Sequence, residues 1–113
     1  CAPVVPCGAA TQRVEQRSGI TLTPASEESA VADVLAKVAS GEADAGVVYV
    51  TDVTAADGAV TGVPIAASSN AVNVYSIAVA ADSGQAALAD EFVALVTGST
   101  GREVMADAGF AEA

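Results

Sequence analysis

The sequence predicts an α/β fold, with a small mixed, mostly parallel sheet flanked by helices. Between residues 31 and 38, valines and a leucine recur at intervals of three and four, the spacing of one helix face. Residues 45–50 then form a run that is apolar on both faces, as in a strand covered on both sides of a parallel sheet. Along the chain the predicted order is β-α-β-α-β-β-β-α-α, which is typical of an α/β domain.

In the first part of the chain, residues 1–8 are expected to be extended, because two prolines disfavour helix in the residues that precede them. Residues 9–17 are predicted as a helix that ends at Gly19, and the β-branched residues 20–23 suit a short strand. A turn leads into the helix with the valine face, and Gly41 stands where a left-handed residue ends a helix.

In the second part, Thr51 and Asp52 are expected to cap a short helical turn. Residues 60–65 and 72–80 are predicted strands, and residues 85–97 form a clear helical pattern that Gly98 interrupts. Thr100 and Glu103 have the spacing of a capping box, which predicts a last helix through Ala108.

Charge and composition exclude several classes of function. The formal net charge of −10 argues against nucleic acid and anionic membrane surfaces as partners. The chain contains no histidine, so Ser-His-Asp and Cys-His catalysis and histidine-ligated metal sites are excluded within it. Scattered aspartates do not have the spacing of a calcium loop, and no metal ligand is predicted.

The turn at Cys7 is the first candidate site. It opens a predicted helix, where free amides and the helix dipole favour an anion, and Gly8 allows a ligand to approach the backbone closely. An ordinary turn into a helix accounts for the same residues. A helix N-terminus also lowers the pKa of a thiol, which leaves open a reactive Cys7, although no general base is apparent.

Two further candidates follow along the chain. The amide of Val31 lies at the start of the next helix, but Glu27 and Glu28 just before it would repel an anion unless they turn outward. Tyr49 closes the predicted buried strand, where a tyrosine is commonly a core residue with its hydroxyl at the surface. Tyr75 has the same ambiguity with less support.

Cys1 and Cys7 are the two cysteines, and they form a possible disulfide if the protein is exported. Bridged α-carbons lie within about 7 Å, whereas six extended residue steps span roughly 20 Å, so the segment between them must loop back.

Four stretches of the sequence resemble, in order, the periplasmic molybdate-binding proteins of ABC transporters, which belong to the type II periplasmic-binding-protein family. They are VPCGAA, EESAVADVLAKVASGEADAGVVYVTD, VNVYSIAV and GSTGREVMADAGF. The resemblance implies two α/β lobes joined by a hinge, with an oxyanion held between them by neutral donors. Serines of the first lobe, and two backbone amides and a tyrosine hydroxyl of the second, supply these donors in the family.

Carried over by motif, the amides fall on Cys7 and Val31 and the hydroxyl falls on Tyr49. The family often has alanine at the position of Cys7, but a backbone contact does not depend on the side chain. The first lobe with its serines and an apolar strand before residue 1 have no counterpart here. We therefore expect a fragment, with residues 1–82 as the second lobe and residues 83–113 as C-terminal helices that return toward the missing first lobe.

The resemblance implies a protein without enzymatic activity or cofactor that binds molybdate or tungstate and delivers it to an ABC permease. It also implies an extracytoplasmic location, in the periplasm or on a cell-surface lipoprotein. An uncovered sheet edge and apolar helix face predict self-association of the fragment. Two alternatives stand beside this hypothesis: a ligand-binding effector domain of a transcription regulator, and a thiol enzyme that uses Cys7.

Overall fold

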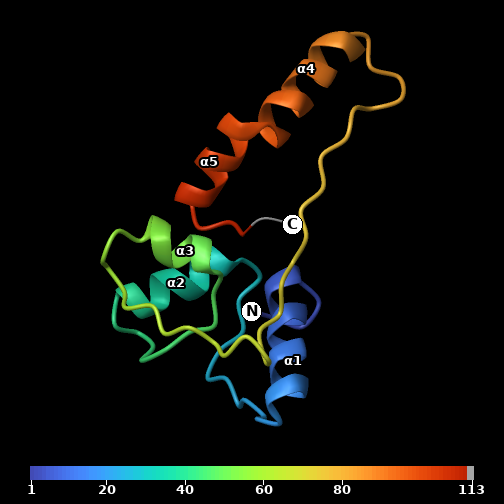
Figure 1. Cartoon of the computed structure of the whole chain (residues 1–113). Coiled ribbons are helices and arrows are strands. Elements are labelled where there is room, and N and C mark those ends of the chain that lie inside the picture. Colours follow the sequence, from blue (N-terminus) through green and yellow to red (C-terminus); the bar gives the residue numbers. More distant parts are fainter. Residues whose placement is uncertain (112–113) are drawn as a thin grey trace. The chain divides into compact units, whose positions relative to one another are not determined.

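A computed structural model describes residues 1–111 of the chain, and these residues form five helices joined by irregular segments (Figure 1). The helices are α1 (Pro6–Ser18), α2 (Val31–Ala39), α3 (Val50–Ala55), α4 (Ala86–Thr97) and α5 (Ser99–Asp107). The chain divides into two compact units, unit 1 (Cys1–Asn73) and unit 2 (from Val74 onward). The predicted boundary between a second lobe, residues 1–82, and C-terminal helices, residues 83–113, stays a prediction. The last two residues of the predicted C-terminal part, 112 and 113, lie outside the described residues.

The predicted α/β fold is wrong for this structure, because residues 1–111 contain helices but no strand. The five segments predicted as extended or as strands, residues 1–8, 20–23, 45–50, 60–65 and 72–80, are irregular apart from residues 6–8, which begin α1, and Val50, which begins α3. A strand is stabilised by hydrogen bonds to a neighbouring strand, and no such ladder joins these segments within the described residues. Many of their side chains are exposed, Val63 and Val72 among them, so apolar patterning without a partner does not make a sheet.

The segment around Gly46 and the segment around Gly62 pack on helices instead of on one another. A Cβ atom at Gly46 would lie 2.7 Å from Cγ1 of Val34 in α2, and one at Gly62 would lie 2.8 Å from Cγ1 of Val53 in α3. Both glycines therefore allow the backbone to approach a helix more closely than a side chain would permit.

Helix α1 begins and ends as its sequence dictates. Pro6 is its first residue, where the missing amide hydrogen costs nothing, and Val5 before it is extended. Gly19 ends the helix in the left-handed conformation with φ of 72°, and its amide donates to the carbonyl of Glu15. The helix predicted over residues 9–17 is confirmed, with three more residues at its start and one more at its end.

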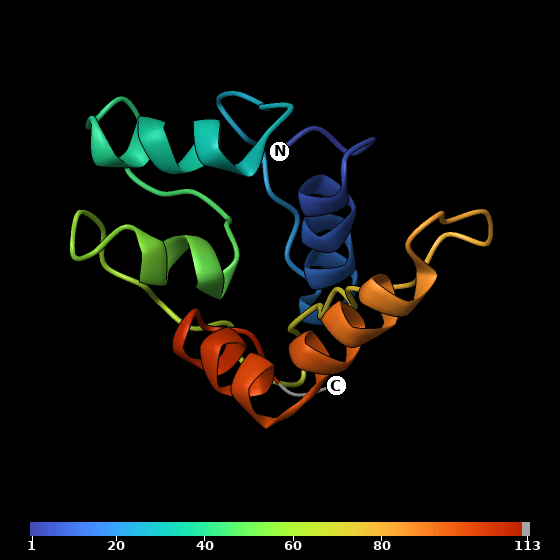
Figure 2. The ribbon, with the colours of Figure 1, turned by 90° about the horizontal axis from the view of Figure 1, so that it is seen from above.

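Helix α2 is also confirmed, and it ends in a Schellman motif. Gly41 has φ of 78°, its amide donates to Val38, and the amide of Glu42 donates to Lys37. The predicted short helical turn after Val50 is α3, whose first turn is closed by Asp52: its carboxylate accepts from the amide of Tyr49 at 2.8 Å. α2 and α3 contact each other, and both begin on the side of unit 1 where α1 lies (Figure 2).

Unit 2 contains α4 and α5, which contact each other and meet at Gly98. The predicted capping box of Thr100 and Glu103 is wrong, because α5 already begins at Ser99 and Gly98 is its N-cap without a side-chain bond. The last helix, predicted through Ala108, is confirmed to within one residue, because α5 ends at Asp107 with Ala108 as its C-cap. Gly109 follows with φ of 92°, and the amide of Phe110 donates to the carbonyl of Met105. The Phe110 ring lies edge-on to Tyr75 with 5.7 Å between the ring centroids.

The buried apolar residues of the described chain are Cys7 and Ala10, both in the first half of α1. The structured centre of unit 1 is therefore the start of α1. In unit 2, by contrast, α4 exposes several of its large apolar side chains, namely Leu88, Phe92 and Leu95. Among the described helices, none has both the length and the apolar character that a membrane span requires.

Candidate functional site

Cys7 is the second residue of α1, and its side chain is bonded to that of Cys1 in a disulfide with 5.7 Å between the α-carbons. The intervening prolines direct the segment back on itself, and the amide of Val5 donates to the carbonyl of Ala2. Within residues 1–111 the amide of Cys7 has no hydrogen-bond acceptor, as expected in the first turn of a helix. It is thus a backbone donor at the positive end of the α1 dipole.

Gly8 has a different use from the one that its sequence position suggests. A Cβ atom there would lie only 1.9 Å from the carbonyl oxygen of Ala2 and 2.8 Å from that of Cys1. The space on the Cβ side of Gly8 is therefore filled by the chain's own first two residues, and the close approach of a ligand to the backbone at this position stays a prediction. Glycine at this position lets the N-terminal segment close over the first turn of α1.

The disulfide also bears on the alternative of a thiol enzyme. Nucleophilic catalysis by cysteine requires a thiolate, and the sulfur of Cys7 is bonded to that of Cys1 in this structure. The described residues contain no free cysteine. The alternative therefore has no support in the structure.

Val31 is the first residue of α2, preceded by Ala30 in extended conformation with φ of −131° and ψ of 143°. Its amide likewise has no acceptor among the described residues. Three residues earlier, the carbonyl of Glu28 accepts a bond of 2.8 Å from the amide of Ala2. The N-terminal segment is thus tied to α1 through Cys1 and to the entry of α2 through Ala2.

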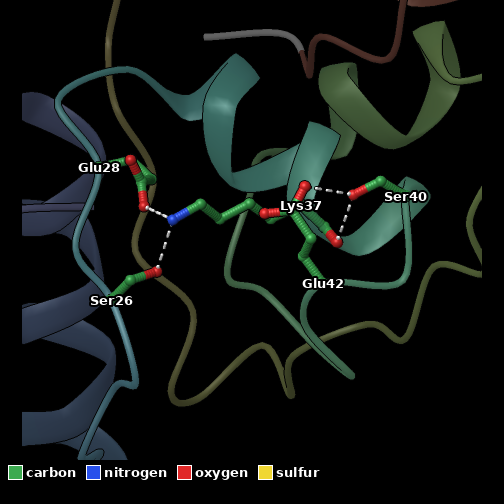
Figure 3. A network of polar contacts seen from close by, with 5 residues as sticks. All are labelled: Ser26, Glu28, Lys37, Ser40 and Glu42. Atoms are coloured by element: carbon green, nitrogen blue, oxygen red, sulfur yellow. Dashed lines mark hydrogen bonds and ion pairs between the residues drawn. The ribbon is translucent and has the colours of Figure 1, made fainter.

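Glu27 and Glu28 were the predicted obstacle to an anion at α2, and the structure pairs the carboxylate of Glu28 with Lys37 (Figure 3). Lys37 also donates to the hydroxyl of Ser26 at 3.1 Å. The hydrogen bond from Lys37, followed by that from Ser26, lowers the pKa of the Glu28 carboxyl, and the same bond from Glu28 raises the pKa of the Lys37 ammonium. The pair removes one unbalanced negative charge from the α2 entry.

A shallow depression of about 360 Å³ lies on this same part of α2. Its lining residues are Glu28, Asp33, Ala36, Lys37, Ser40 and Glu42. Three carboxylates against one ammonium make it unsuitable for an oxyanion, and it includes none of the three predicted ligand-binding residues.

Tyr49 is the N-cap of α3 and is half-buried. Its hydroxyl oxygen accepts a hydrogen bond of 2.8 Å from Nδ2 of Asn73, and Oδ1 of Asn73 accepts one of 2.5 Å from Nη2 of Arg13 in α1. The sequence interpretation missed Arg13 and Asn73. The one signal available was that Asn73 is a polar residue between Val72 and Val74 in an otherwise apolar segment.

All three predicted residues therefore lie in unit 1, and each is tied to α1 or to the segment before it. Cys7 is in α1, the entry of α2 is bonded to Ala2, and Tyr49 is linked to α1 through Asn73. Arg13 follows Cys7 by six residues, or about 9 Å along the helix axis. Two backbone donors at helix starts and a phenol are neutral groups that suit a fully deprotonated oxyanion. Their assignment to one ligand stays a prediction.

Comparison with known proteins gives the family. Residues 3–111 match the family described as bacterial extracellular solute-binding protein. The molybdate-binding protein ModA of Mycobacterium bovis and that of two strains of Mycobacterium tuberculosis are each 50% identical to the chain over 112 residues. The match covers 99% of this chain and 43% of each relative, so the chain spans less than half the length of these relatives. No solved structure matches the chain significantly. Because the family match covers nearly every residue, the chain belongs to the bacterial extracellular solute-binding proteins.

Proposed function

We propose that this chain is part of an extracytoplasmic protein that binds molybdate or tungstate and delivers it to an ABC permease. The observation that carries the proposal is the 50% identity with proteins named molybdate-binding, over 99% of the chain. As the ligand donors within this chain, the proposal takes the amides of Cys7 and Val31 and the hydroxyl of Tyr49, which match the family's motif. A location in the periplasm or on a cell-surface lipoprotein, and a role in binding without catalysis, belong to the same proposal.

The net charge of −10 does not prevent this function. Exposed carboxylates are screened beyond about 8 Å at physiological salt, whereas amides act on the ligand at hydrogen-bond distance. Glu28, three residues before the start of α2 at Val31, is paired with Lys37. The donors therefore act locally against a screened background.

The alternative of an effector domain in a transcription regulator has less support. The matching family is described as extracellular, whereas a transcription regulator acts on DNA inside the cell. We therefore retain the transport function as the proposal.

The test is a titration of the chain with molybdate, followed through the amide chemical shifts in solution NMR. Because part of the donor set of the family lies outside this chain, we expect saturable but weak binding, in the millimolar range, with shifts at Cys7 and Val31. Chloride at equal ionic strength is the control for screening. If molybdate and tungstate produce no saturable change at these amides, the proposed function is wrong.

The amide hydrogen of Val31 can be removed by a substitution that leaves the rest of α2 nearly unchanged. Proline is favoured at the first position of a helix, and the extended conformation of Ala30 is the one required before proline. V31P therefore deletes the donor and keeps the helix, and we expect the affinity for molybdate to fall about tenfold. The matched control is V31A, which retains the amide and should bind as the wild type does.

A further inference from the structure

A chain of three side chains links α1 to the hydroxyl of Tyr49. Arg13 donates to Oδ1 of Asn73 at 2.5 Å, and Nδ2 of Asn73 donates to the hydroxyl oxygen of Tyr49 at 2.8 Å. The first of these bonds joins residues 60 apart in the sequence and the second joins residues 24 apart, and both are partly buried. Such a connection is specific to the folded unit.

The chemistry of Arg13 decides which way the amide of Asn73 faces. A guanidinium has only donors, so it must meet the oxygen of the amide, and the amide nitrogen must then face Tyr49. The phenol oxygen consequently accepts this bond, and its single proton is directed away from Asn73. A hydroxyl that accepts one bond is polarised toward donating another, so the chain also strengthens the phenol as a donor.

Arg13 also differs from the paired cation of unit 1, Lys37. Lys37 is paired with the carboxylate of Glu28, whereas among the described residues Arg13 meets no carboxylate within ion-pair distance, in a chain with 14 acidic residues. Its bonding partner Asn73 is neutral, so its charge stays available to attract an anion.

We propose that Arg13 and Asn73 are positioning residues that direct the hydroxyl proton of Tyr49 toward the bound oxyanion. The inference rests on the proposed function and deepens it, because it adds two side chains that set the donor direction of the same site. Arg13 acts through Asn73 and contributes a positive charge nearby. Neither residue is required to touch the ligand.

The first test needs no ligand. The chain has two tyrosines, so labelled tyrosine gives two Cζ resonances, and Tyr75 in unit 2 serves as an internal reference. N73D presents acceptors to both neighbours, so the hydroxyl proton should turn toward the introduced carboxylate and shift the Tyr49 resonance. R13A should shift it less. R17A is the matched control, because Arg17 lies on the same helix and donates to the carbonyl of Asn70 instead.

The second test is molybdate binding by the same variants. We expect R13A to weaken it about fivefold, because Asn73 remains beside Tyr49, and N73D about tenfold or more, because the Tyr49 proton then turns toward the introduced carboxylate and is lost to the ligand; both effects are of the size of one hydrogen bond. R17A removes the same charge from α1 and should change the affinity little. R13K keeps a donor for Asn73 and should recover part of the loss, which a purely structural role of Arg13 would not predict.

The outcomes separate the two proposals. If the wild type responds to molybdate and both R13A and N73D respond equally well, the positioning role is wrong while the proposed function stands. An unchanged Tyr49 resonance in N73D also overturns the positioning role. If the wild type shows no response, the proposed function is wrong, and the resonance of Tyr49 still reports whether the hydrogen-bond chain exists.

Discussion

In unit 1, hydrogen bonds join segments that are far apart in the sequence and a disulfide ties the N-terminal segment to α1, whereas unit 2 is held mainly by contacts between neighbouring helices. The N-terminal segment, α1, the α2 entry and Tyr49 are connected through Cys1, Ala2 and Asn73. Unit 2 has the contact of α4 with α5 and the ring pair of Tyr75 and Phe110. The difference teaches that the stability of unit 1 depends on a few specific ties, several of which meet at its candidate site.

Removing the disulfide should give the largest difference between the units. C1S/C7S frees a loop with a sequence separation of six, and we expect unit 1 to lose about 2 kcal/mol of unfolding free energy. Hydrogen exchange in increasing urea should show lower protection of α1 and α2 amides, with α4 and α5 unchanged. Reductant should reproduce the effect in the wild type and have none in the double variant. An equal loss of protection in both units would contradict this account.

A single methyl group added at Gly8 should have the second-largest effect on stability. G8A places a Cβ atom 1.9 Å from the carbonyl oxygen of Ala2, so the N-terminal segment must move, at a cost of about 1–3 kcal/mol. In a helix without this contact, alanine would instead stabilise by roughly 0.5–1 kcal/mol. Chemical denaturation therefore distinguishes the two cases by the sign of the change in unfolding free energy that G8A produces. The control is G84A, since a Cβ atom at Gly84 meets nothing within 4 Å.

The glycines and the strands show what the sequence could and could not predict. α1, α2, α4 and α5 were predicted close to their observed bounds, because helical hydrogen bonds close within four residues and glycines mark the ends. Residues 60–65 and 72–80 were wrongly predicted as strands, because a strand depends on a partner that its own residues do not specify.

The candidate site likewise contains some residues that the sequence predicted and others that it did not. Cys7, Val31 and Tyr49 stand at or next to the starts of helices, which local pattern predicts. The contact of Arg13 with Asn73 spans 60 residues, and nothing in the neighbourhood of either residue predicts it. The sequence position of Gly8 likewise gives no information about Ala2, whose carbonyl fills the space on the Cβ side of that glycine.

The exposed side chains of α4 should matter little for stability and more for association. Phe92 and Leu95 are each 57% exposed, so F92S/L95S should change the unfolding free energy by no more than about 0.5 kcal/mol. Self-association of the chain stays a prediction, and if these side chains drive it, light scattering at high concentration should show a lower mass for the variant. E91S, on the same helix, is the control. A wild type that stays monomeric would contradict the prediction.

The ion pair of unit 1 should give the smallest effect, and its pH dependence has a definite sign. Because Lys37 lowers the pKa of Glu28, the pair stabilises the α2 entry above the ordinary glutamate pKa of about 4.3, and the contribution is lost as pH falls through the lowered value. Because Glu28 raises the pKa of Lys37, the contribution is present below the ordinary lysine pKa of about 10.4 and is lost as pH rises through the raised value.

We therefore expect E28Q to be slightly less stable than the wild type at neutral pH, and the difference to vanish in acid below the lowered pKa of Glu28. Both side chains are partly exposed, at 34% for Lys37 and 21% for Glu28, so solvent and salt weaken the pair. Thermal unfolding at a series of pH values measures the difference, and added salt should reduce it. E27Q is the matched control, because Glu27 forms no ion pair among the described residues. A difference between E28Q and the wild type that persists unchanged into acid would mean that Glu28 acts at the α2 entry through packing and not through its charge.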